Sequence, residues 1–324
     1  MPRIAIPSGA FVGAGAGLAS ALLFYSAARG TPGISAALLV LTHLPMLLAG
    51  LGWGLPAAGA GALATAVVVL FTNGVWPALG TTVSLGLPVV GIVYFAFLSR
   101  ALGSDPTERE WYPPGRLVTG IALYGGALPL LMLPLSGSSY EDLRAPLAEL
   151  VRRFSKESVS ELGLRPMSEA QIQAAVNLIV TTLPGFIAVY WTAIMCVNTY
   201  VAARIVRASG RLARAWSPMP DLRLPKDTLV IFGIALLACY ATGLVAIAGV
   251  SLTGSLLFAF FLTGLALIHS IARRRSPLLL ILLYLALLFA VPYVAILLII
   301  GGLADTLVDL KRRLGGLPPA ANPS

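Results

Sequence analysis

The sequence predicts an all-α membrane protein, a polytopic transmembrane helix bundle of about eight to ten hydrophobic helices that ends in a short hairpin. Charged residues make up 11% of the 324 residues and hydrophobic residues 58%, and the mean hydropathy is +0.89. About a quarter of an average soluble protein is charged. The few charges also lie outside the middle of the apolar runs, as expected for segments in hydrocarbon, where a charged side chain is costly.

Ten apolar runs divide the chain into candidate membrane helices. They cover residues 9–28, 34–52, 55–72, 77–98, 117–136, 171–203, 228–249, 251–271, 277–291 and 292–308. A hydrocarbon core of about 30 Å requires about 20 helical residues, so most of these runs can span it. The last two are individually short and meet at Pro292. We therefore expect them to form a hairpin that enters the membrane and returns to the same side.

The orientation follows from the basic residues, which cluster in the loops 204–227 and 272–276 and in the C-terminal tail. Loops rich in Lys and Arg stay in the cytoplasm. This rule predicts that these segments, both termini and the loop 99–116 are cytoplasmic, with 137–170 outside, in a bacterial cytoplasmic (inner) membrane. The net charge of +9 comes from such loops, and they lack the aromatic interleaving of nucleic-acid-binding modules, so we expect no nucleic-acid partner.

The segment 137–170 is the largest polar insertion in the predicted membrane domain, which covers 1–316. Apolar residues recur in it at helical spacing, at Leu143, Leu147, Leu150, Val151 and Phe154. This pattern predicts an amphipathic helix that lies on the outer surface, with a lid over a ligand as the alternative. We expect the Pro-rich tail 317–324 to be disordered.

Small residues repeat every four positions on the first predicted helix, at Gly9, Gly13, Gly17 and Ala21. Such a ladder lies on one helix face and lets another backbone approach closely. The partner is either another helix of the same chain or another subunit, and the sequence leaves both open. A second ladder comprises Ala58, Ala62 and Ala66.

Polar residues follow one face of the sixth predicted helix. They are Asn177, Thr181, Pro184, Trp191 and Asn198. A polar group in lipid without a partner is costly, so this face should point into the bundle. It is either a hydrogen-bonded seam or the wall of a small-molecule pocket, which Asn177, Trp191 and Asn198 would then line.

Catalytic and metal-binding patterns are missing from the sequence. No Asp or Glu lies in the middle of a predicted span, and the two histidines are too few for the usual zinc sites. No Gly-x-Ser-x-Gly motif occurs. Cys196 and Cys239 lie in apolar runs, where a thiol behaves as a small hydrophobic group. We therefore expect a protein that is not an enzyme and that holds no metal or cofactor.

Asp305 and Asp309 lie one turn apart at the end of the last predicted helix, followed by Lys311 and Arg312. We expect these residues at the cytoplasmic boundary of the membrane. Either they are a solvated helix end with weak ion pairs, or they form a docking patch for a partner.

The C-terminal part of the chain carries a family resemblance. Ser276-Pro277-Leu278 through Tyr284, then Pro292, then the run from Gly302-Leu303-Ala304-Asp305 through Asp309 to Arg312-Arg313 resembles the close of the YybS-like family of predicted bacterial membrane proteins. The resemblance covers most of the chain and departs from the family at Leu307, where an aromatic residue is common.

This family looks distantly similar to the membrane substrate-binding subunits of energy-coupling-factor vitamin transporters. Those subunits dock on a coupling subunit through a small-residue ladder on the first helix. The resemblance therefore implies the lipid bilayer, another membrane subunit and a coupling ATPase complex as partners, and it gives the ladder at Gly9, Gly13 and Gly17 a docking role.

Two functions remain open from the sequence. One is a binding or transport-related subunit for a small, fairly apolar or uncharged molecule. The other is a non-catalytic membrane scaffold or assembly factor whose basic cytoplasmic loops recruit partners or anionic lipid.

Overall fold

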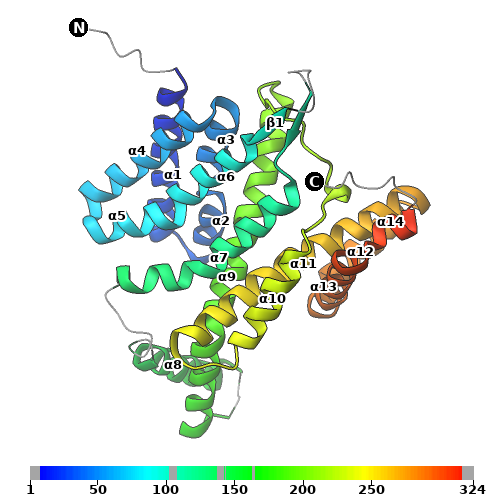
Figure 1. The fold of residues 1–324 in the computed structure, drawn as a ribbon. Helices are drawn as coiled ribbons and strands as arrows, with labels where there is room; N and C mark the ends of the chain where they lie inside the picture. The colour runs from blue at the N-terminus through cyan, green and yellow to red at the C-terminus, as the bar shows by residue number, and fades with distance from the viewer. Residues whose placement is uncertain (1–7, 102–107, 137–141, 143, 163–164, 316–324) are drawn as a thin grey trace.

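The computed structural model describes residues 8–101, 108–136, 142, 144–162 and 165–315, and these are almost entirely helical (Figure 1). Eight helical segments within them are long and apolar enough to cross a membrane. The predicted all-α polytopic bundle is thus confirmed. The tail 317–324, Leu143 and most of 137–143 lie outside the described residues.

The first half of the chain forms a bundle of short and broken helices. In order they are α1 (Ser8–Arg29), α2 (Pro32–Leu41), α3 (Leu44–Trp53), α4 (Leu55–Asn73), α5 (Val75–Thr81), the π-helix η1 (Thr82–Gly86) and α6 (Leu87–Phe97). The run 34–52 becomes two helices because Pro45, in the first turn of α3, has no N–H to continue α2. A short antiparallel pair, β1 (Ser99–Ala101) and β2 (Arg109–Trp111), follows.

The second half contains the longest helices. They are α7 (Pro114–Ser136), α8 (Arg144–Leu162), α9 (Glu169–Ala208), the 3₁₀ turn η3 (Met219–Asp221), α10 (Asp227–Ala238), α11 (Gly243–Arg275), α12 (Leu278–Phe289), α13 (Val291–Val308) and α14 (Leu310–Gly315). The helices α7 and α9 connect the two halves. One apolar core packs α3, α6, α7 and α9 around Met46, Val89 and Met195, and a second packs α7, α11 and α13 around Phe260.

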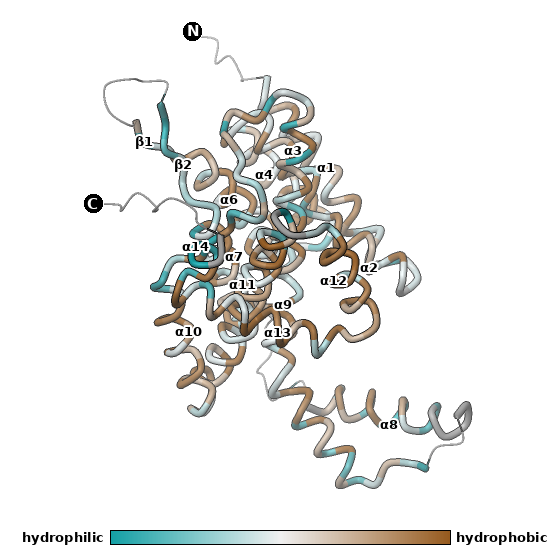
Figure 2. Tube along the Cα trace, turned by 90° about the vertical axis from the view of Figure 1, so that its right-hand side faces the viewer, coloured by the Kyte–Doolittle hydropathy of each residue, from teal (hydrophilic) through white to brown (hydrophobic). Residues whose placement is uncertain are grey.

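The amphipathic helix predicted in the polar insertion is α8, which stands away from the bundle with the first turns of α9 (Figure 2). Ala148 and Val151 pack against Ile172 and Val176 of α9. Leu150 and Phe154, by contrast, are exposed. The apolar face of α8 is therefore divided between α9 and the surroundings.

One predicted boundary is wrong. The sequence pattern separated the runs 228–249 and 251–271 near residue 250, whereas α10 ends at Ala238 and α11 begins at Gly243. No residue near 250 breaks a helix, but Gly243 takes a positive φ of 61°, which only glycine adopts readily. At about 1.5 Å per residue, α10 is too short to cross the membrane by itself.

The predicted C-terminal hairpin is confirmed. α12 and α13 meet at Ala290, whose φ of −136° and ψ of 41° interrupt the helix, and the apex of the pair points away from α14 (Figure 1). α13 returns along α11, where a Cβ on Gly264 would meet Leu298 O and one on Gly302 would meet Phe260 O. The end of α13 therefore comes back to the side from which α12 started.

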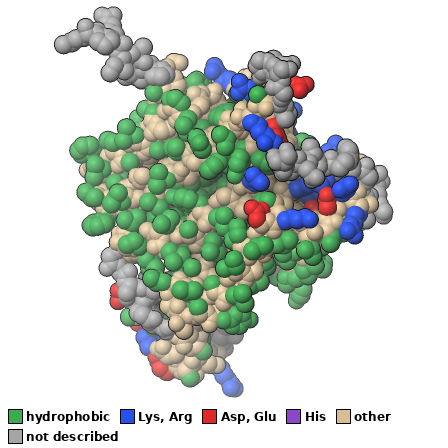
Figure 3. Space-filling view, viewed as in Figure 1, with side chains coloured by type: hydrophobic (Ala, Val, Ile, Leu, Met, Phe, Trp, Pro, Cys, Tyr) green, Lys and Arg blue, Asp and Glu red, His purple; other side chains and the backbone are tan. Residues whose placement is uncertain are grey.

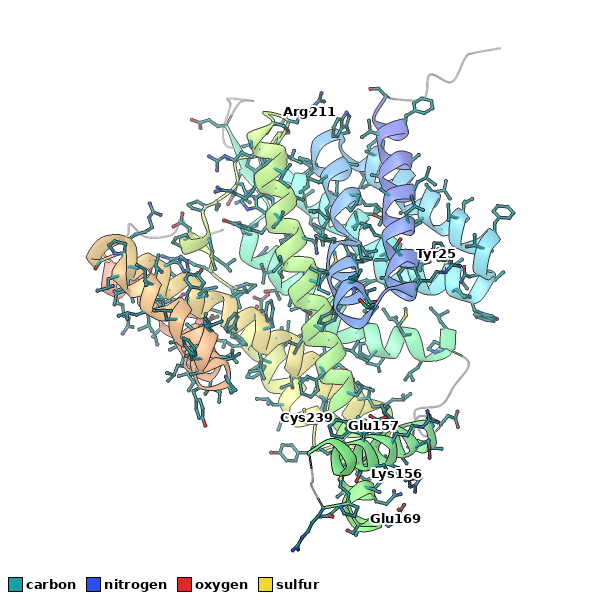
Figure 4. All side chains as sticks on the ribbon, turned by 180° about the vertical axis from the view of Figure 1, so that it is seen from behind. Tyr25, Lys156, Glu157, Glu169, Arg211 and Cys239 are labelled. Atoms are coloured by element: carbon teal, nitrogen blue, oxygen red, sulfur yellow. The ribbon has the colours of Figure 1, made fainter. Side chains whose placement is uncertain are left out.

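The basic loops lie at one end of the molecule. Lys and Arg side chains gather near β1 and α14, while the flank of α4 and α5 is apolar (Figure 3). Arg211 lies at the opposite end of the molecule from Lys156 and Glu157 of α8 (Figure 4). The Arg211 guanidinium lies 4.5 Å from the ring centroid of Trp53, against which Gly9 packs, so the start of α1 belongs to the same end.

Candidate functional site

The small-residue ladder of α1 packs against α4 of the same chain. A Cβ on Gly13 would lie 2.1 Å from Ala57 O, and one on Gly17 would lie 2.2 Å from Gly61 O. The Thr65 hydroxyl donates to Gly17 O at 2.9 Å, and Gly9 and Ala21 are also buried. In this structure the face is therefore occupied by a helix of the same chain.

The second ladder has the same internal role. Ala58 is fully buried, and a Cβ on Gly50 of α3 would lie 3.1 Å from its Cβ. On the next turn, a Cβ on Gly86 would lie 3.1 Å from Ala62 Cβ. The helix α4 is thus held closely on two sides.

Pro88 creates a cluster of free carbonyl groups at η1. In an α-helix its N–H would bond to Ser84 O, but proline has no N–H. The chain widens to a π-helix, in which Leu87 N–H donates to Thr82 O instead of Val83 O. Two carbonyls inside the bundle, Val83 O and Ser84 O, therefore need other donors.

Three ring side chains from distant segments supply those donors. Tyr124 Oη donates to Val83 O at 2.6 Å, and Trp191 Nε1 donates to Ser84 O at 3.1 Å. His43 Nε2 lies 3.2 Å from the same Ser84 O. The rings of Tyr124 and Trp191 lie 5.4 Å apart. Both indole and phenol are thereby locked in place.

A groove lies between α6 and α7 and ends at these rings. This α6–α7 groove has a volume of about 200 Å³. Its lining residues are Leu87, Pro88, Gly91, Ile92, Phe95, Tyr112, Arg116, Leu117, Gly120, Ile121, Tyr124 and Trp191. Leu87 and Phe95 are also exposed, so the groove opens to the surface, and Arg116 is its one charged lining residue.

A second cavity lies on the other side of α7. This α7–α11 cavity has a volume of about 300 Å³ and is lined from α7, α9, α11, the segment 216–222 and Tyr284 of α12. Leu117 and Ile121 line both the groove and this cavity, and so separate them. A third, shallower and apolar cavity of about 350 Å³ lies between α10 and α11.

The predicted site residues of α9 do not come together. Trp191 lines the α6–α7 groove, whereas Asn198 and Asn177 line none of these three cavities. Asn198 Nδ2 donates to Val40 O at 2.7 Å, a carbonyl freed where α2 ends, and to Ile194 O at 2.8 Å. Asn198 therefore joins α9 to the end of α2 through structural hydrogen bonds.

The expectation that Asn177 faces the bundle interior is corrected, because this residue is exposed. At 100° per residue, the 21 residues from Asn177 to Asn198 make almost six turns, so the two side chains point in directions about 60° apart. In addition, a helix of 40 residues is about 60 Å long, so its first turns extend beyond the bundle towards α8. Sequence spacing alone misses both effects.

The C-terminal acids are also not a solvated helix end. Asp305 forms an ion pair with Lys311, Oδ2 to Nζ 3.0 Å, and their side chains are 2% and 1% exposed. Asp305 Oδ1 accepts the Lys311 backbone N–H at 2.8 Å, and Lys311 Nζ also donates to Leu222 O. Burial lowers the pKa of the Lys311 ammonium, and Asp305 opposes that shift.

Asp309 forms a second link to the same loop. It takes a left-handed φ of 53° between α13 and α14, and both its carboxylate oxygens accept from Arg223 Nη1 at 2.8 Å. Arg312 is exposed. Asp305 and Asp309 therefore hold the end of α13 and the start of α14 to residues 222–223.

Part of the basic loop is used inside the protein as well. Arg214 is buried and donates to Ala96 O at 2.9 Å and to Tyr112 O at 3.1 Å, and burial lowers the pKa of its guanidinium. These are carbonyls at and beyond the end of α6, where a cation is favourable. Arg204, Arg207 and Lys226 remain exposed.

Sequence reasoning missed Tyr124, His43, Arg214 and the buried state of Lys311. Pro88 within an apolar run was the signal for free carbonyls near η1, but nothing local indicates which rings fill them. For the part of the chain that the structure describes, no three or more His, Cys, Asp or Glu side chains are grouped to hold a metal ion.

Comparison with known proteins gives a single family. A family model described as a predicted membrane protein, DUF2232, matches residues 18–306. Neither a search of curated proteins nor a search of solved structures returned a match. The matched range begins within α1, just after Gly17, ends two residues before the end of α13, and includes the groove, the π-helix and Asp305. The chain therefore belongs to the DUF2232 family of predicted membrane proteins.

Proposed function

We propose that this protein is a binding or transport-related subunit of the bacterial cytoplasmic membrane, and that the α6–α7 groove holds a small, mostly apolar, uncharged molecule. The observation that carries the proposal is a groove lined by locked Trp191 and Tyr124 rings and kept open by two glycines. Gly91 and Gly120 line it, and a Cβ on either would meet nothing within 4 Å.

The lining sets the chemistry of the ligand. The Trp191 N–H and the Tyr124 O–H already donate to carbonyls of η1. A ligand in the groove would therefore contact the ring surfaces of these residues and not their donors. Aromatic and aliphatic surfaces with few polar groups favour an apolar ligand. The volume of about 200 Å³ is below the about 300–1,000 Å³ of drug-sized sites, so the ligand is small.

Gly120 offers a cleaner test of this site than Trp191. Replacing Trp191 removes its bond to Ser84 O and its contact with Tyr124, so the fold suffers together with the groove. Gly120→Leu instead places a side chain in open space. It also removes a helical glycine, which by itself favours the helix by about 0.5–1 kcal/mol.

We expect native mass spectrometry of gently extracted protein to show a small bound molecule in the wild type. Occupancy should fall about tenfold or more in Gly120→Leu, equivalent to about 1.4 kcal/mol of binding. The matched control is Gly59→Leu, which also enters open space but in α4, away from all three cavities. Arg116→Gln should leave the binding of an uncharged molecule unchanged.

The outcome of that comparison also decides between the two functions. Equal occupancy in the wild type and Gly120→Leu would contradict a site in the groove. A wild type that carries no ligand and responds to none in a metabolite panel would favour the scaffold, with Arg204, Arg207 and Lys226 as its exposed basic surface.

The transport form of this proposal, with a coupling ATPase complex as partner, rests on the sequence resemblance of the C-terminal part of the chain. Such a partner would have to dock elsewhere than on Gly9, Gly13 and Gly17, because α4 and Trp53 already cover that face.

The proposed orientation places the end with Ser209 in the cytoplasm and α8 outside, from the charge of the loops. In a background lacking Cys196 and Cys239, an impermeant maleimide should label Lys156→Cys in spheroplasts. Ser209→Cys should react only after permeabilisation. Both positions are exposed, so access to the reagent decides the result. Labelling of position 209 in sealed spheroplasts would reverse the orientation.

A further inference from the structure

The α7–α11 cavity has uncharged walls from parts of the chain that are far apart in sequence. Its lining residues come from α7, α9, α11, the segment 216–222 and α12, and they include Leu117, Ile121, Cys196 and Thr199. None of them is charged. Burying an ionised group without a partner costs far more than burying a neutral one, so the cavity suits only a neutral molecule.

Thr199 is the polar feature of this cavity. It is 3% exposed, and its hydroxyl is buried without a hydrogen-bond partner among the described residues. Of the other threonines of α9, Thr181 and Thr182 donate to the carbonyl four residues earlier, at 2.8 and 2.7 Å, whereas Thr192 is unpaired like Thr199. An unpaired buried hydroxyl costs about 1–3 kcal/mol. The hydroxyl oxygen has less than 1 Å² of accessible surface, so a molecule in the cavity removes this cost only when the Thr199 side chain rotates about its Cα–Cβ bond.

The unpaired hydroxyl and the cavity coincide only at Thr199. Within the described residues, the other buried side-chain atoms without a partner are Ser20 Oγ, His43 Nδ1, Thr192 Oγ1 and Ser251 Oγ. None of these four lines any of the three cavities. The combination therefore distinguishes Thr199 from ordinary packing imperfections.

From this geometry we infer a second ligand site, separate from the α6–α7 groove. The α7–α11 cavity binds a small, neutral, mostly hydrocarbon molecule with one hydroxyl or carbonyl group, which forms a hydrogen bond with Thr199. Leu117 and Ile121, 6% and 4% exposed, separate the two sites. The inference therefore does not depend on a ligand in the groove.

Cys196 provides a reporter within the cavity wall. It lines the α7–α11 cavity, and the only other cysteine, Cys239, lies at the end of α10. In a Cys239→Ala protein, the rate at which N-ethylmaleimide modifies Cys196 therefore measures access to the cavity. An occupant of the cavity should slow this reaction.

The test compares p-cresol with toluene, which has the same ring and methyl group without the hydroxyl. In the Cys239→Ala protein, p-cresol should protect Cys196 at about fivefold lower concentration than toluene, the effect of one hydrogen bond. Thr199→Val keeps the shape but removes the hydroxyl, so both compounds should then protect equally. Thr199→Ser should keep the preference for p-cresol.

Melting temperatures with each compound, measured on the same variants, decide the result if Cys196 reacts too slowly. The same preference for p-cresol should appear as a larger increase in melting temperature, and Thr199→Val should abolish it. Both compounds are also small and apolar enough for the groove, so the comparison is repeated in Gly120→Leu, where the preference for p-cresol should remain. The inference is overturned if neither compound has an effect, or if Thr199→Val retains the preference.

Discussion

Gly13→Ala should destabilise the protein by about 3 kcal/mol, the upper part of the range for overpacking a tight contact. The added Cβ would lie 2.1 Å from Ala57 O and 2.7 Å from Ala57 Cα, which are backbone atoms that cannot rotate away. One turn further, Gly17 holds α1 equally close to Gly61, so the helices cannot separate locally. Larger residues at position 13 should prevent a stable fold.

Gly15→Ala is the matched control, because it lies on the same helix and a Cβ there meets nothing within 4 Å. It should be neutral or stabilising by up to about 1 kcal/mol, since it removes a helical glycine. Thermal melting and titration with sodium dodecyl sulfate would measure both variants. Equal stability of Gly13→Ala and Gly15→Ala would mean that α1 does not pack on α4 through this ladder.

Asp305→Ala should destabilise the protein by about 3–5 kcal/mol, because it leaves the Lys311 ammonium buried without its partner. The side chains of the pair are 2% and 1% exposed, so water cannot replace the lost carboxylate. The substitution also removes the acceptor of the Lys311 backbone N–H. We expect α14 to detach from Leu222, which limited proteolysis after Lys311 and Arg312 would detect.

Two variants separate this effect from a general sensitivity of the chain end. Asp309→Asn keeps a residue that tolerates the left-handed backbone and weakens a pair whose side chains are 32% and 38% exposed, so it should cost no more than about 1 kcal/mol. The double substitution Asp305→Leu with Lys311→Met removes both charges and should recover much of the lost stability. A double variant as unstable as Asp305→Ala would show that the charge pair is not the cause.

At the end of α13, the sequence predicts where the acidic residues lie but not which residues they contact. The positions of Asp305 and Asp309 at the boundary of an apolar run are visible from hydropathy. Their burial is not, because it depends on Leu222 and Arg223, which lie more than one membrane span earlier in the chain. In the same way, Trp191 was identified as a polar group inside a span, but its acceptor Ser84 O was not.

By itself, the sequence determined the membrane class, the approximate positions of most helices, the C-terminal hairpin and the tight face of α1. These are local properties, because apolar length, a break between helices and four-residue spacing are each contained in one short segment. The tertiary structure decided which helix covers the ladder, that Asn177 is exposed while Trp191 lines the groove, and that the Asp305–Lys311 pair is buried. Each of these depends on where distant helices cross, which the period of one helix does not specify.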